Sequence, residues 1–165
     1  MRIVSIQCYI PIFVFGTLRA NGRFSKYLTE FLDTKQDVFI KNYQLCELES
    51  GDVYIEKPKS TLTCSGVHGE IYHINYECLW RIQHLENSSG SFPKTYELAI
   101  LDGARGKDGK EILGFYFSLK RKKVISSGDC FQRDDLMSKL KHYIEQTPAD
   151  EITDDNIICA MHRTY

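Results

Sequence analysis

The feature that most constrains the fold is a short apolar run near the start of the chain that stops at a glycine. Residues 10–18 read IPIFVFGTL and are rich in β-branched and aromatic side chains. Such a run predicts a buried central strand that enters a turn at Gly16. Because Gln7 and Pro11 interrupt the apolar stretch and no small-residue cleavage site follows it, we expect neither a signal peptide nor a membrane-spanning helix.

The remaining sequence mixes strand and helix patterns without strict alternation of the two. Strands are predicted at residues 38–48, within 49–66, and at 67–74, 95–102, 111–119 and 124–125. Amphipathic helices are predicted at residues 24–32, from an N-cap at Asn75 to about residue 86, and at 134–146. In strand 67–74, apolar residues alternate with the polar His68, Glu70 and His73. This order predicts an α+β domain rather than a doubly wound parallel sheet.

Composition narrows the classes of function. The chain has 165 residues, of which 42% are hydrophobic, which is enough for one domain with its own core. Its 21 basic and 22 acidic residues give a formal net charge of -1, so we expect no nucleic-acid partner. The basic run at residues 120–123 predicts a solvated strand end, with contact to an anionic partner as the alternative.

The cysteines and histidines point to a cytoplasmic protein without a metal. Six cysteines are spread along the chain with no C-x-x-C pair, and a chain with this core needs no disulfide framework. We therefore expect reduced thiols and a cytoplasmic location. The five histidines show no zinc-ligand spacing, so no metal site is expected.

The turn after the first strand is the first candidate for chemistry. A strand that ends at a glycine and turns sharply leaves backbone N–H groups that can hold a carboxylate or an oxyanion. Gly16 also permits close approach of a ligand to the backbone. The alternative is an ordinary turn at the end of a strand. No Gly-Lys-Ser/Thr follows, so the turn is not a phosphate loop.

The second candidate is Glu86, near the end of the predicted helix that begins after Asn75. Leu79, Ile82 and Glu86 have the spacing i, i+3 and i+7, which places the carboxylate close to the apolar stripe. A desolvated carboxyl group keeps its proton to a higher pH, and this suits proton transfer near neutral pH. The alternative is that the helix ends at His84 and leaves Glu86 in a solvated loop.

Five segments in order resemble the γ-glutamylcyclotransferase-like superfamily, also called the AIG2-like family. The first strand of that family ends in Tyr-Gly-Ser/Thr-Leu, and a later strand reads Val-x-Gly-Glu-Val-Tyr-x-Ile. A helix with Leu-x-x-Leu-Asp-x-x-Glu, a Tyr-x-Arg segment and a Ser-Gly-Asp-Trp motif follow. The matching segments here are residues 15–18 (FGTL), 67–74 (VHGEIYHI), 79–86 (LWRIQHLE), 92–94 (FPK) and 127–130 (SGDC).

The resemblance implies a fold and a division of the chain. The family fold is a small mixed β-barrel flanked by helices, which we expect for residues 1–133. Residues 134–165 lie beyond the resemblance, and we expect them to form a C-terminal helical extension packed on or beside that domain.

The resemblance also implies a reaction that needs no cofactor. Enzymes of the family release 5-oxoproline from small γ-glutamyl compounds, here a γ-glutamyl amine or amide. Glu86 matches the general acid and base. The residues expected to bind the substrate are Phe15, Gly16, Thr17, Leu18, Arg19, Lys94 and Tyr116.

Four positions depart from the family pattern. Phe15 replaces a Tyr, Gln83 an Asp, Lys94 an Arg and Cys130 a Trp. The alternative function is therefore a catalytically inactive member. Such a protein would bind a small ligand or a protein partner through the same pocket or through residues 134–165.

Overall fold

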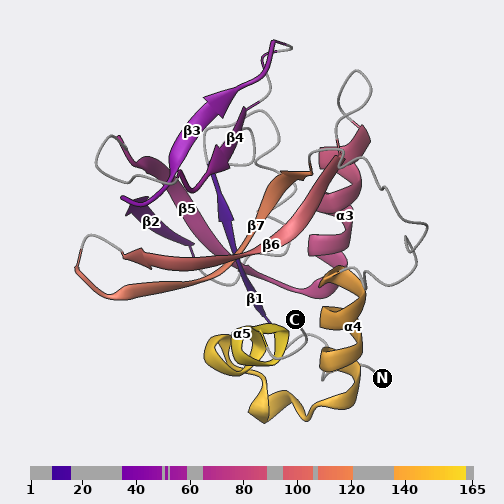
Figure 1. The fold of residues 1–165 in the computed structure, drawn as a ribbon. Coiled ribbons are helices and arrows are strands. Elements are labelled where there is room, and N and C mark those ends of the chain that lie inside the picture. The colour runs from indigo at the N-terminus through magenta and orange to yellow at the C-terminus, as the bar shows by residue number, and fades with distance from the viewer. Residues whose placement is uncertain are drawn as a thin grey trace, which may run out of the picture.

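The computed structural model describes eight parts of the chain. They are residues 9–15, 35–49, 51, 53–58, 65–88, 95–105, 108–120 and 136–162 (Figure 1). The helix predicted at residues 24–32 and the strand predicted at 124–125 lie outside these parts.

The main sheet of the described residues has five strands. They are β1 (Ile10–Val14), β2 (Lys35–Ile40), β5 (Val67–Ile74), β6 (Thr95–Arg105) and β7 (Glu111–Lys120). Their order is β2-β5-β1-β7-β6, and β1 pairs parallel to β7, whereas the other pairs are antiparallel. All five residues of β1 are buried, which confirms the prediction of a central strand.

The sheet is mixed, as expected, but the expectation of a closed barrel is wrong for the described part of the chain. The edge strands β2 and β6 approach each other without pairing, so the sheet stays open. β6 changes register between Leu101 and Ala104, and such irregularities bend a sheet. The bend curls the sheet without bringing its two edges into hydrogen-bonded register.

A separate two-stranded sheet is formed by β3 (Gln44–Glu47) and β4 (Val53–Glu56), which confirms the short strand predicted within residues 49–66. The single strand predicted at 38–48 is wrong, because the chain bends at residues 41–42 between β2 and β3. Ile40 and Tyr43 are both buried in one apolar cluster. In a straight strand, residues three apart face opposite sides, so burying both in one cluster requires the bend.

β5 has the predicted bounds but not the predicted alternation. Four consecutive residues, Gly69 to Tyr72, are buried, including Glu70. β5 lies between β2 and β1, and both of its faces are covered. Ile71 packs into one apolar cluster and Tyr72 into the other. Glu70 is one of the polar residues in the alternating pattern, and it is buried.

Three α-helices occur in the described residues, together with the short 3-10 helix η2 (Ala149–Glu151). They are α3 (Tyr76–Ser88), α4 (Leu136–Gln146) and α5 (Asp154–His162). The backbone N–H of Cys78 donates to Oδ1 of Asn75 at 2.9 Å, which confirms the predicted N-cap. α3 continues to Ser88, so the alternative in which it ends at His84 is wrong.

Two apolar clusters lie on opposite faces of the main sheet. The first joins β1, β5, β6 and β7 to all three helices, and the second joins the other face to the β3–β4 hairpin. The C-terminal segment contributes six buried residues to the first cluster: Leu136, Met137, Leu140, Ile157, Ile158 and Met161. α4 and α5 therefore pack directly on the core, at the lower end of Figure 1. The division of the chain at residue 133 stays a prediction.

Candidate functional site

The end of β1 leads into the predicted site. Val14 is the last residue of the strand and pairs with Glu70 of β5. Phe15 follows and is half-buried, with its ring centroid 5.9 Å from that of Phe13 and the two planes 29° apart. Residues 16–19 and Lys94 lie outside the described residues, so the proposed roles of the glycine turn stay predictions.

Tyr116 of β7 is the second predicted binding residue that the structure describes. Its ring meets Tyr43 edge-on, with centroids 5.8 Å apart and planes at 76°. Burial raises the pKa of Tyr116 above the ordinary value of 10.0, and a hydrogen bond with the Ser118 side chain partly opposes this shift. Phe15 and Tyr116 pack against the same apolar cluster, so the structure brings these two residues to one face of the sheet.

α3 returns the chain to the end of the sheet where β1 stops. β5 runs antiparallel to β1 and finishes beside Ile10, and α3 starts at Tyr76, with only Asn75 between the strand and the helix. Leu79 and Ile82 pack on the first cluster together with Val14, so the helix lies back along the sheet. In Figure 1, α3 and β1 both end at the upper end of the molecule. The backbone of residue 86 is in the last turn of α3.

The predicted residues are therefore divided between the two faces at one end of the sheet. Phe15 and Tyr116 face the second cluster, whereas α3, which carries residue 86, covers the first. The end of β1 lies between the two groups.

Glu70 is a charged residue at this end of the sheet that the sequence analysis did not single out. Its exposed fraction is 4%, and the Tyr72 hydroxyl donates to its Oε1 at 3.0 Å. The signal available in the sequence was its place inside the VHGEIYHI segment, directly after Gly69.

Gly69 explains how β1 and β5 pack beside the site. A Cβ atom at this position would lie 2.5 Å from the Phe13 ring and 2.5 Å from the carbonyl oxygen of Val14. Only glycine leaves room for that ring over the strand. Gly69 thus allows β1 to pack closely against β5 just before the predicted turn at Gly16.

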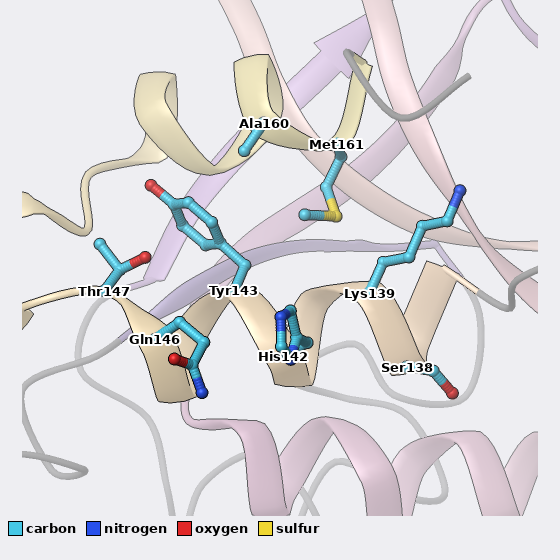
Figure 2. Close-up of a pocket in the computed structure, with 8 residues that line it drawn as sticks. All are labelled: Ser138, Lys139, His142, Tyr143, Gln146, Thr147, Ala160 and Met161. Carbon is cyan, nitrogen blue, oxygen red and sulfur yellow. The ribbon is translucent and has the colours of Figure 1, made fainter.

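A groove of about 430 Å³ lies elsewhere, between α4 and α5 (Figure 2). Its walls are formed by Ser138, Lys139, His142, Tyr143, Gln146, Thr147, Ala160 and Met161. Tyr143 and Lys139 project toward α5, and Met161 points back between them. None of the predicted site residues lines this groove. Among the described residues, no group of three or more His, Cys, Asp or Glu side chains is arranged to hold a metal ion.

Comparison with known protein families shows which family the chain belongs to. Residues 12–132 match the family described as "Gamma-glutamyl cyclotransferase, AIG2-like". The chain belongs to this family. The match runs from β1 through α3 to beyond β7 and stops before α4. The C-terminal helices and the groove between them therefore lie outside the part that defines this AIG2-like protein as a family member.

Two solved structures resemble this family member weakly. An uncharacterized protein from Homo sapiens is 16% identical, with a TM-score of 0.44, covering 70% of this chain and 69% of that one. The S177A variant of Kluyveromyces lactis allophanate hydrolase is 14% identical, with a TM-score of 0.46. That likeness covers 84% of this chain and 21% of the hydrolase. No curated protein sequence matches the chain. Membership in the family rests on the sequence match.

No helix in the described parts of this family member is both long enough and apolar enough to cross a membrane.

Proposed function

We propose that this AIG2-like protein is a γ-glutamylcyclotransferase that releases 5-oxoproline from a γ-glutamyl amine or amide, with Glu86 as general acid and base. The observation that carries the proposal is the family match over residues 12–132, which includes the last three residues of β1 and all of α3. The continuation of α3 through residue 86 supports it, because a helix gives a catalytic group a fixed position.

The reaction is an intramolecular aminolysis. A base takes a proton from the substrate's α-ammonium group, and the free amine attacks the γ-carbonyl carbon. The new carbon–nitrogen bond closes a five-membered lactam, and the ring nitrogen gives up a second proton. The bond to the leaving amine breaks, and that amine takes up both protons and departs as an ammonium ion. No water or cofactor enters the balance, so one carboxylate can serve both proton transfers.

The remaining predicted residues hold the substrate in a folded-back pose. We assign the backbone at Gly16, Thr17 and Leu18 to the α-carboxylate or to the oxygen that gains charge during attack. Arg19 and Lys94 supply positive charge, and Phe15 and Tyr116 line the apolar side. Holding the amine close to the carbonyl supplies the proximity that this reaction needs.

A panel of γ-glutamyl amines and amides, incubated with the full chain from neutral to mildly alkaline pH, tests the proposal. We expect 5-oxoproline, detected by mass spectrometry, with at least one member of the panel. Glu86→Gln should lower turnover by about 100-fold or more, because general acid–base catalysis contributes on that scale. Glu77→Gln, at an exposed position in the first turn of α3, is the matched control and should leave turnover unchanged.

Three outcomes have distinct meanings. Turnover retained in a folded Glu86→Gln variant removes Glu86 from the mechanism. Binding of γ-glutamyl compounds without any 5-oxoproline rejects the enzyme and leaves the alternative of an inactive, ligand-binding family member. Neither binding nor product rejects the γ-glutamyl site altogether.

A further inference from the structure

We draw no further inference here: the strongest candidate, the groove of about 430 Å³ between α4 and α5, lies outside the residues that match the family, and nothing in the structure shows what covers it.

Discussion

The imidazole of His73 lies 2.9 Å from the carboxylate of Asp154, although 81 positions separate them in the chain. His73 is on β5 inside the family match, and Asp154 opens α5 beyond it. The contact therefore joins the main sheet to the C-terminal helices. It adds a polar link to the apolar docking made by Ile157, Ile158 and Met161.

This contact should make the docking of α5 sensitive to pH. Asp154→Asn should lower the free energy of unfolding by up to about 1 kcal/mol at pH 5.5 and by less at pH 8, because an ordinary imidazole gains its charge between these two pH values. Both side chains are partly exposed, which limits the effect. Denaturant titrations at the two pH values measure it.

Asp155→Asn is the matched control, because Asp155 shares the first turn of α5 and its favourable interaction with the helix dipole. Its effect should be the same at both pH values. An Asp154→Asn effect independent of pH would show that His73 contributes no charge to the contact.

Tyr116 should make stability fall at alkaline pH. Because burial raises the pKa of Tyr116 above 10.0, the unfolded chain releases this proton at lower pH than the folded protein. The neutral Tyr116 phenol makes its full contribution to the free energy of unfolding below about pH 10. This contribution is lost as the pH rises through the pKa of Tyr116 in the folded protein. Tyr116→Phe should therefore lose less stability between pH 9 and 11 than the wild type, in denaturant titrations across that range.

Ser118→Ala provides a test in the opposite direction. Its hydrogen bond lowers the pKa of Tyr116, so its removal should allow a larger rise and steepen the alkaline loss of stability. If the free energy of unfolding depended on pH in the same way for the wild type and both variants, the burial of the Tyr116 phenol would be contradicted.

Gly69→Ala should be strongly destabilising. A methyl group there meets the Phe13 ring and a backbone oxygen at 2.5 Å, and the oxygen cannot move without shifting β1. We expect a loss of about 3 kcal/mol or more, measured by denaturant titration. Gly51→Ala, with open space but φ of 89°, should cost only about 1–2 kcal/mol. If the two substitutions lowered the free energy of unfolding equally, β1 would be able to shift with little loss of stability at the end that leads into the site.

The C-terminal helices should unfold together with the sheet. Ile157 and Leu140 are fully buried in the first cluster, which also contains Val14 and Phe115. Ile157→Ala should cost about 2–5 kcal/mol and leave a single unfolding transition, followed both by circular dichroism and by Trp80 fluorescence. A separate early transition would mean that α5 is an independent appendage.

Several features of this fold were predictable because they depend on residues close together in the chain. The apolar run before Gly16 predicted β1, and the side chain of Asn75 predicted where α3 begins. The strand bounds of β5 followed from the alternation of apolar and polar residues over positions 67–74. The ordered short motifs also led to the family, since each motif is a local pattern.

Other features depend on contacts between distant segments. The bend between β2 and β3 arises because Ile40 and Tyr43 share one cluster, and no local signal marks it. The open sheet depends on how far β2 and β6 can approach each other.

The sequence by itself determined the central strand, the capped helix that carries residue 86, and membership in the AIG2-like family. Only the tertiary structure decided that Glu70 is buried in β5 beside the end of β1, that α4 and α5 share the core, and that His73 contacts Asp154. The physical reason is that burial depends on which segments cover a residue. Glu70 is a polar residue of the alternating segment 67–74, and it is buried because β1 and β2 flank β5 and apolar clusters cover both faces of the strand.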